Sequence, residues 1–229
     1  MPLSRAFVPH RPLIVATGNP GKLRELRALL EDLPFDLHGL GELKVAAPEE
    51  SGATFLENAL LKARHAAASA AAIGFGGAAA PQVAAIADDS GLEVDALGGA
   101  PGIISARYAG VGADDAANNA KLMSAMAGVA QERRGARYRC ALVCVFPADY
   151  AAPLVAEGVW EGFILDTPRG SGGFGYDPYF WLPDLGLTAA ELDPQEKNRI
   201  SHRGIAMRRL RGLLAARDLL AAHEPPVRA

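Results

Sequence analysis

A short apolar run that leads straight into a turn and then a helical pattern constrains this fold more than any other sequence feature. Residues 12–16 read Pro-Leu-Ile-Val-Ala and predict a buried strand, and residues 17–21 read Thr-Gly-Asn-Pro-Gly and predict a turn. The stretch that follows, up to Pro34, carries leucine at helical spacing, at Leu23, Leu26, Leu29, Leu30 and Leu33. A buried strand joined directly to such a helix favours an α/β fold.

The rest of the chain continues this mixture of strands and helices, and no segment repeats. Further strands are predicted at 83–86, 137–146, 154–165 and 179–182, with a strand and loop over 36–51 and a loop or insertion over 73–82. Further helices are predicted from Thr54 with Glu57 as its capping-box partner, over 114–126, from Asp193 and from Ser201. We therefore expect one α/β domain over residues 12–229, preceded by an extension at residues 1–11.

Two of these elements carry specific expectations about burial. Glu157 and Glu161 interrupt the alternation of apolar and polar residues that a half-buried strand at 154–165 would have. The last helix should turn four apolar side chains toward the core, namely Ile205, Leu210, Leu213 and Leu214.

An acidic run, Asp88-Asp89-Ser90-Gly91-Leu92-Glu93, follows the apolar residues 83–86, where we expect the strand to end. Two like charges a few Å apart raise each other's pKa unless a cation lies between them. Mg²⁺ takes oxygen ligands and is commonly held by one or two carboxylates together with substrate phosphates. An isolated run of this kind would more often be a solvated turn, but here it is a candidate metal and phosphate site.

The turn at residues 18–22, Gly-Asn-Pro-Gly-Lys, has the composition of a phosphate site. Small residues let the backbone approach a ligand, a helix N-terminus supplies free N–H groups, and Lys22 adds positive charge. The turn is not a Walker A loop, because Ala16 and Leu23 stand where that motif needs Gly and Ser or Thr. A plain helix-opening turn explains the same residues about equally well.

A glycine-rich segment at 170–175 matches the letters of a dinucleotide-binding motif but not its context. A strand-like run follows it, whereas the motif must open a helix. An aromatic side chain at its tip, Phe174 or Tyr176, would nevertheless suit stacking on a nucleotide base, although a hydrophobic plug under the loop is an equal alternative.

Positive charge gathers at two successive helix starts, where the helix macrodipole favours anions. Lys197, His202 and Arg203 lie there, so a bound anion or electron-rich group between them would account for the arrangement, although ordinary surface charge is an equal alternative. The adjacent pair Glu49 and Glu50, just before another helix, would alone be solvated charge.

The composition argues against several classes of protein. The net charge of the 229 residues is −3, which gives no support to sequence-independent nucleic-acid binding. No apolar run approaches the ~20 residues of a membrane span, and the first residues lack the apolar core of a signal peptide. Cys140 and Cys144 would lie on one strand face about 13 Å apart, too far for a disulfide. We expect packing thiols of a cytoplasmic protein, without a zinc site.

In order along the chain, these segments resemble the inosine triphosphate pyrophosphatase family, also called XTP/dITP diphosphatases, which clears deaminated purine nucleotides. Any one block is weak, but six or more in register are specific. They extend over residues 12 to about 222 and leave out 1–11 and 73–82. The matching blocks are 17–22, 49–52, 54–59, 87–92, 98–102, 172–178, Lys197 and 201–204.

The resemblance implies an elongated, twisted mixed sheet flanked by helices, with two lobes around a central cleft, and a homodimer. It implies Mg²⁺-dependent hydrolysis of a purine nucleoside triphosphate between the α and β phosphorus, which gives the monophosphate and pyrophosphate. No nucleic acid or membrane partner is implied.

The resemblance also implies a role for each matched residue. Asp89 would accept a proton and bind the metal, with Glu49 as the preferred second ligand and Glu50 as an alternative, and Ser90 would contact the nucleotide. The phosphates would be held by Thr17, Gly18, Asn19, Pro20, Gly21 and Lys22, with Lys62 as a further contact. The base and sugar pocket would consist of Phe174, Gly175, Tyr176, Asp177, Lys197, His202 and Arg203.

Two other functions remain open at this point. The Maf-like nucleotide pyrophosphatases would share the early Asn and Lys turn, but not residues 172–177 or 201–203. A nucleotide-binding sensor without turnover would need the phosphate and base residues but not both carboxylate sites, and this chain has both.

Overall fold

The computed structural model describes residues 11–75, 83–146, 152–217 and 219–220. Within these residues, one mixed sheet has the strand order β2-β1-β3-β4-β5-β6-β7. The first strand is parallel to both of its neighbours, and every pair from β3 to β7 is antiparallel. The strands are β1 Arg11–Val15, β2 Phe35–Gly39, β3 Ala84–Val94, β4 Gly135–Val145, β5 Leu154–Ile164, β6 Phe180–Leu182 and β7 Leu187–Thr188.

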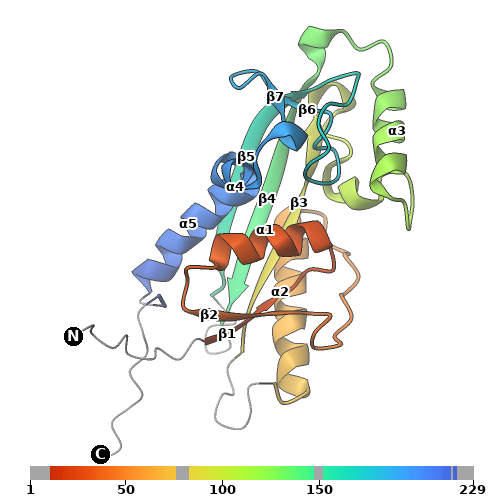
Figure 1. The fold of residues 1–229 in the computed structure, drawn as a ribbon. Helices are drawn as coiled ribbons and strands as arrows, with labels where there is room; N and C mark the ends of the chain where they lie inside the picture. Colours follow the sequence, from red (N-terminus) through yellow and green to blue (C-terminus); the bar gives the residue numbers. More distant parts are fainter. Residues whose placement is uncertain (1–10, 76–82, 147–151, 218, 221–229) are drawn as a thin grey trace, which may run out of the picture.

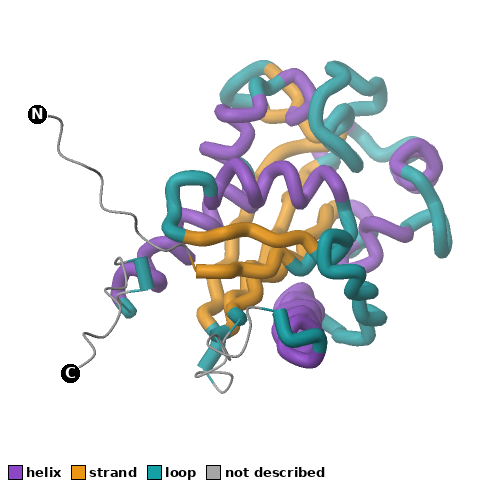
Figure 2. Tube along the Cα trace, turned by 60° about the horizontal axis from the view of Figure 1, so that its bottom comes forward, coloured by secondary structure: helices purple, strands orange, loops and turns teal. Residues whose placement is uncertain are grey.

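Helices cover both faces of this sheet (Figures 1 and 2). One core cluster joins α1 and α5 to the face of Ile86 and Cys140, and a second joins α2 to the opposite face at Ala85 and Ala87. The helices are α1 Pro20–Leu30, α2 Phe55–Ala72, α3 Asp115–Ala125, α4 Pro194–Ile200 and α5 His202–Ala216, and the short 3₁₀ helices are η1 Asp95–Leu97, η2 Gly102–Arg107, η3 Gln131–Arg133 and η5 Ala189–Glu191. The predicted α/β class is thereby confirmed.

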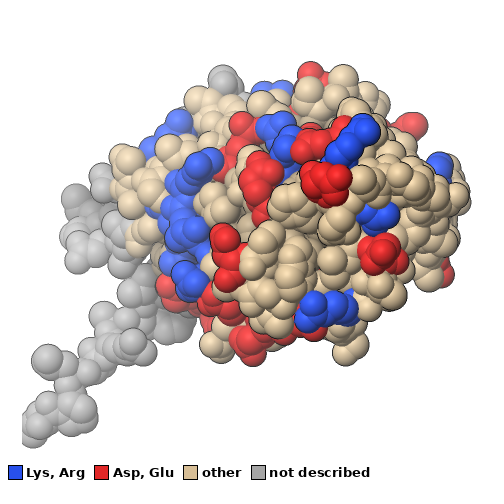
Figure 3. All heavy atoms as spheres, turned by 90° about the horizontal axis from the view of Figure 1, so that it is seen from above, with Lys and Arg blue, Asp and Glu red and all other residues tan. Residues whose placement is uncertain are grey.

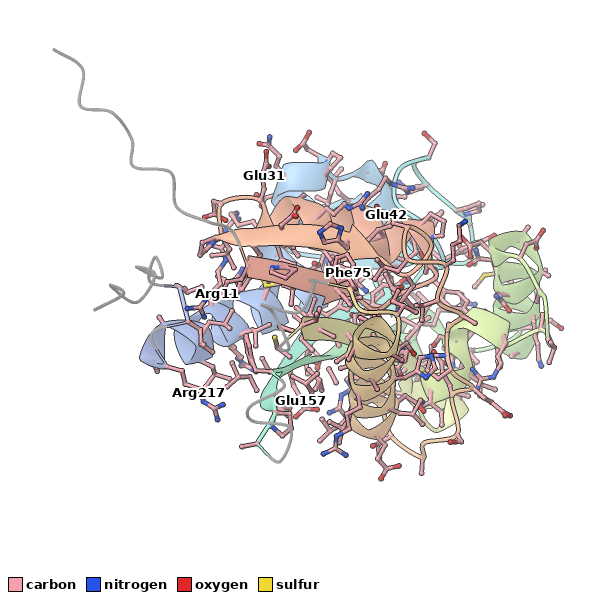
Figure 4. The ribbon with its side chains drawn as sticks, turned by 90° about the horizontal axis from the view of Figure 1, so that it is seen from below. Arg11, Glu31, Glu42, Phe75, Glu157 and Arg217 are labelled. Carbon is pink, nitrogen blue, oxygen red and sulfur yellow. The ribbon has the colours of Figure 1, made fainter. Side chains whose placement is uncertain are left out.

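The three long strands β3, β4 and β5 run through the whole molecule and connect two lobes (Figure 1). One lobe contains β1, β2, α1 and α2, and the other contains α3, β6 and β7. Phe75, which follows α2 (Figure 4), packs edge-on against His38 of β2 with ring centroids 4.8 Å apart. A third core cluster, which includes Tyr138, Trp160 and Phe180, fills the second lobe.

The predicted helix starts at Thr54, Asp193 and Ser201 are present with their N-caps, but the capping box is incomplete, because the Glu57 side chain accepts from Ala53 N instead of Thr54 N. Thr54 accepts a hydrogen bond from the backbone of Glu57, Asp193 from that of Gln195, and Ser201 from that of Gly204. Both cysteines are buried without a disulfide, as expected. No helix among the described residues is long and apolar enough to cross a membrane.

The prediction that the third strand ends at the acidic run is wrong. β3 continues through Asp88 and Asp89 to Val94, and its polar residues pair in register with β4. Charged residues are tolerated in a central strand only when they are paired, and here each carboxylate meets basic side chains from a flanking helix.

Three smaller expectations need correction or fall outside the described residues. The alternation of β5 is regular, because Glu157 and Glu161 both lie on its exposed face. Leu213 is 38% exposed, so α5 buries Leu210 and Leu214 but not this residue. Strand β1 already begins at Arg11, while residues 1–10 and 76–82 are not among those described.

Candidate active site

The acidic pair of β3 faces two different sides of the sheet. Successive residues of a strand point to opposite faces. Asp88 meets Lys22 of α1 and Arg203 of α5, whereas Asp89 meets Lys62 of α2 on the other face. The two carboxylates therefore do not share one cation, and β3 separates two charged groups of side chains.

Asp88 organises the α1 and α5 face. Its carboxylate is fully buried and accepts from Lys22 Nζ at 2.6 Å, from Arg203 Nε at 3.2 Å and from Arg203 Nη2 at 3.3 Å. The Cys140 thiol and the Ser90 hydroxyl add donors at 2.9 and 3.1 Å. Burial by itself raises the pKa of Asp88, but the charges of Arg203 and Lys22 outweigh it and hold that pKa well below the usual value. Asp88 is thus ionised at pH 7 and pairs with both cations.

Glu25 completes this group and was missed in the sequence. It lies on α1 one turn beyond Lys22 and accepts from Lys197 Nζ at 2.8 Å and from Arg203 Nη1. Lys197 also donates to Asp177 at 2.5 Å. The result is a buried set of three cations and three carboxylates, called the ionic cluster below: Lys22, Lys197 and Arg203 with Glu25, Asp88 and Asp177.

The ionic cluster holds the glycine-rich loop in place. Asp177 Oδ2 accepts from the backbone N–H of Phe174 at 2.9 Å, and a Cβ at Gly173 would lie 2.0 Å from the same oxygen. The Phe174 ring lies under the Lys197 ammonium at 4.8 Å from the ring centroid. It also lies against Gly21, where a Cβ would come within 2.6 Å of the ring. Glycine at position 21 therefore lets α1 and the aromatic loop touch.

These residues enclose a cavity of about 220 Å³ between the two lobes. His202 forms part of its wall and stacks on Tyr138 with ring centroids 4.7 Å apart. Burial, and then the charge of Arg203, hold the pKa of His202 well below its usual value, so this side chain is neutral at pH 7. Ten predicted residues line the cavity: Asn19, Lys22, Ser90, Phe174, Gly175, Tyr176, Asp177, Lys197, His202 and Arg203.

Two polar side chains of the cavity wall differ in their hydrogen bonding. Nδ1 of His202 is buried and has no hydrogen-bond partner among the described residues. Tyr176, in contrast, is buried and donates its hydroxyl to the carbonyl of Ser105 at 2.8 Å. Tyr176 therefore anchors the loop, and Phe174 is the aromatic ring of this loop whose face lies at the cavity without such a bond.

The turn at the start of α1 was expected to offer free backbone N–H groups to a ligand, but these groups are already bound. Asn19 Oδ1 accepts from the backbone of Gly21 and of Lys22 at 2.8 and 3.1 Å, and Thr17 Oγ1 accepts from Asn19 N at 3.1 Å. Pro20 has no N–H to offer. The helix start is thus satisfied by its own cap, and the Lys22 ammonium and the exposed Gly18 backbone are what remains for an anion.

The opposite face of β3 carries a smaller charged group on α2 and the loop before it. Lys62 Nζ donates to Asp89 Oδ1 at 2.6 Å and to Glu50 Oε1 at 3.1 Å. Arg107 of η2 donates to the other oxygen of Glu50 at 2.9 Å. Glu49 is exposed and makes no ion pair among the described residues, so the structure brings Glu50 rather than Glu49 to Asp89.

A divalent cation fits this second group. Asp89 Oδ2 is buried and has no hydrogen-bond partner in the described part of the chain. A buried carboxylate oxygen without a donor is costly, and a hard cation would satisfy it. Burial raises the pKa of Asp89, which suits a proton acceptor. The described residues contain no group of three or more His, Cys, Asp or Glu that could hold a metal. Mg²⁺ is commonly held by one or two carboxylates together with substrate phosphates.

Comparisons with known proteins agree with this geometry. A sequence profile of the Ham1 family matches residues 13–213. The dITP/XTP pyrophosphatase of Methylococcus capsulatus is 52% identical over 197 residues, which are 86% of this chain and 92% of that protein. The structure of a HAM1 protein from Coxiella burnetii has a TM-score of 0.77 at 43% identity, and covers 90% of this chain and 99% of that one. A nucleoside-triphosphatase / dITP/XTP pyrophosphatase from Mycobacterium abscessus gives 0.64 at 42% identity, with coverages of 89% and 98%. This chain belongs to the Ham1 family.

Proposed function

We propose that this protein hydrolyses deaminated purine nucleoside triphosphates (ITP, dITP and XTP) to the monophosphate and pyrophosphate. The observation that carries the proposal is the placement of β3 between the cavity and the Lys62–Asp89–Glu50 group. Ser90 and Gly91 line the cavity, while the preceding residue Asp89 belongs to the charged group on the other face. The relatives named dITP/XTP pyrophosphatase support the same reaction.

The negative charge of a triphosphate needs positive charge near the reacting phosphorus. Lys22 and Lys62 lie on opposite faces of β3 and can approach the phosphate chain from two sides. Phosphoryl and related transfers depend mainly on such positioning and on charge stabilisation. We assign Lys22 and Lys62 to the phosphates and Asp89 to the attacking water, whose proton the carboxylate accepts.

The metal that best fits the residues is Mg²⁺, held by Asp89 and Glu50. When bound, Mg²⁺ would neutralise charge on the phosphates and make the phosphorus easier to attack. We prefer Glu50 over Glu49 because its carboxylate shares Lys62 with Asp89. Glu50→Gln should raise the Mg²⁺ concentration needed for half-maximal activity, and Glu49→Gln is the matched control. If only Glu49→Gln has this effect, the assignment is wrong.

The cavity wall supports selectivity for a 6-keto purine. Arg203 has five N–H groups, and Asp88, Glu25 and Ser90 accept from its three nitrogens, which leaves one Nη1 hydrogen for a ligand. The tautomer of His202 with hydrogen on Nδ1 offers a second donor. Two donors suit the keto oxygen of hypoxanthine or xanthine and oppose the amino group of adenine.

Pyrophosphate release tests the reaction and its selectivity. With Mg²⁺, kcat/KM for ITP, dITP and XTP should exceed that for ATP by at least the ~10-fold that one lost hydrogen bond of about 1.5 kcal/mol provides. Comparable kcat/KM for ATP and ITP would refute the donor argument. Binding of ITP without release of pyrophosphate would favour the sensor instead.

We also propose that the protein is a cytoplasmic homodimer that binds no nucleic acid. On the face seen from above, acidic and basic side chains are interspersed (Figure 3), which gives no support to a nucleic-acid surface. Light scattering coupled to gel filtration tests the dimer, and a mass corresponding to one chain of 23.9 kDa would exclude it.

A further inference from the structure

Gly175, in the wall of the cavity, is held by a helix of the second lobe. Its backbone N–H donates to Asp115 Oδ2 at 2.7 Å, and its carbonyl accepts from Asn119 Nδ2 at 2.8 Å. Both backbone polar groups of one residue are thus bound to side chains one turn apart on α3. Gly175 has φ +63°, a left-handed conformation in which a side chain would be strained, so this contact fixes an otherwise permissive position.

The orientation of Asn119 leaves little freedom in this contact. Its Nδ2 donates to two carbonyls, those of Gly175 and Asp115, each at 2.8 Å. Only the nitrogen of an amide can donate to a carbonyl, so the side chain has one orientation. Asn119 is 9% exposed, whereas Asp115 is exposed and open to substitution without disturbing the core.

The same loop has two further side-chain attachments. Tyr176, the residue after Gly175, donates to Ser105 of η2 in the second lobe, while Asp177 is bound by Lys197 of α4. Phe174, the ring available for stacking, directly precedes Gly175 in the chain, and its backbone N–H donates to Asp177 Oδ2. A change in the position of Gly175 therefore moves Phe174 relative to the ionic cluster.

We propose that Asp115 is a positioning residue, which sets the affinity for the base by holding Gly175, and with it the Phe174 ring, in place from α3. The proposal rests on the proposed function, because it assigns the cavity beside Phe174 to the base. Asp115 also lines this cavity, so a direct contact with the ribose 2′-hydroxyl is the competing explanation, and a comparison of ITP with dITP separates the two.

The test compares Asp115→Ala with Asp115→Asn, which keeps an oxygen that can accept from Gly175 N. The matched control is Asp184→Ala, an exposed carboxylate without an ion pair among the described residues. We expect Asp115→Ala to raise KM about 3- to 10-fold, the range for one exposed hydrogen bond, equally for ITP and dITP and with kcat within twofold. The Asp115→Asn and Asp184→Ala variants should have KM values near that of the unmodified protein.

Amide hydrogen exchange of the free protein provides a readout that does not depend on turnover. Asp115→Ala should speed exchange at residues 174–176, whereas Asp184→Ala should not. This measurement separates the proposed function from the positioning role of Asp115. If the unmodified protein releases no pyrophosphate from ITP, the function is refuted, but the exchange experiment still tests whether Asp115 holds Gly175. Three results would overturn the positioning role. The first is that Asp115→Ala changes neither the exchange rates nor KM. The second is that KM rises for ITP but not for dITP, and the third is that KM rises equally in the Ala and Asn variants.

Discussion

The substitution Glu25→Gln tests the ionic cluster directly. Glu25 has a side-chain exposure of 14% and accepts from Lys197 and Arg203. The cluster contains three cations and three carboxylates, so its net charge is zero, and replacing one carboxylate by an amide leaves a net charge of +1 in a largely buried site. In this variant Lys197 still pairs with Asp177, and Arg203 still pairs with Asp88. The loss of stability should therefore be smaller than for removing one partner of an isolated buried pair.

The expected magnitude follows from the hydrogen bonds that change. A hydrogen bond to a charged group contributes about 1.5–3 kcal/mol, and the amide can replace only one of the two. We therefore expect the free energy of unfolding to fall by about 1.5–3 kcal/mol at pH 7. For a domain of this size that corresponds to a Tm lower by about 3–12 °C. Glu31→Gln, at the exposed end of the same helix, is the control and should change Tm by less than about 2 °C.

The pH dependence provides a second check. Burial by itself raises the pKa of Glu25, but the charges of Arg203 and Lys197 outweigh it and hold the pKa below its usual value. A carboxyl group with a lowered folded-state pKa stabilises the fold above its unfolded pKa, and this contribution is lost as the pH falls through the folded-state pKa. The stability difference between the unmodified protein and Glu25→Gln should be complete at pH 7 and shrink below the ordinary value of 4.5.

Urea unfolding of the three proteins at pH 7 and at several values below pH 5 measures both quantities. A loss below about 0.5 kcal/mol at pH 7 would mean that Glu25 does not stabilise the cluster. A difference that stays constant across the pH range would mean that it acts through packing and not through charge.

The other predictions concern turnover, phosphate binding and the contact between α1 and the aromatic loop. Asp89→Asn should lower kcat at least ~10²-fold in a pyrophosphate assay, and near-normal turnover with Mg²⁺ would remove Asp89 from the mechanism. Lys22→Ala should weaken binding of ITP far more than binding of inosine in calorimetry; equal losses would place its ammonium away from the phosphates. Gly21→Ala should displace the Phe174 ring and destabilise the protein by about 1–3 kcal/mol in urea unfolding, while Gly41→Ala, whose Cβ meets nothing within 4 Å, should have no such effect.

Most of the architecture could be predicted because its signals are local. The helix starts at Thr54, Asp193 and Ser201 follow from side chains that cap their own backbone, and the predicted caps are present. The extent of β3 could not be predicted in this way. Asp88 and Asp89 remain in a strand because cations from three different helices reach them, and no neighbouring residue in the sequence reveals those partners.

The same reasoning explains which parts of the candidate site were missed. Glu25 and Asp115 look like ordinary surface acids of their helices, and their partners Lys197 and Gly175 are distant in sequence. The spacing of three residues between Lys22 and Glu25, which puts both on one side of α1, was the one available signal. The sequence prediction included ten residues that line the cavity, because the family resemblance assigned separate local motifs to one site.

The ionic cluster also sets the order in which a newly made chain can become active. Glu25 and Lys197 are 172 residues apart, and Asp88 and Arg203 are 115 apart. A growing chain exposes α1 and β3 long before α4 and α5 leave the ribosome, so Lys22 can pair with Asp88 early, whereas Glu25 must wait for Lys197 and Arg203. A chain that stops before residue 203 could still pair its long strands, but it could not close the cavity. Catalytic competence should therefore appear only after α4 and α5 have packed against the sheet, which makes turnover a reporter of that last packing step.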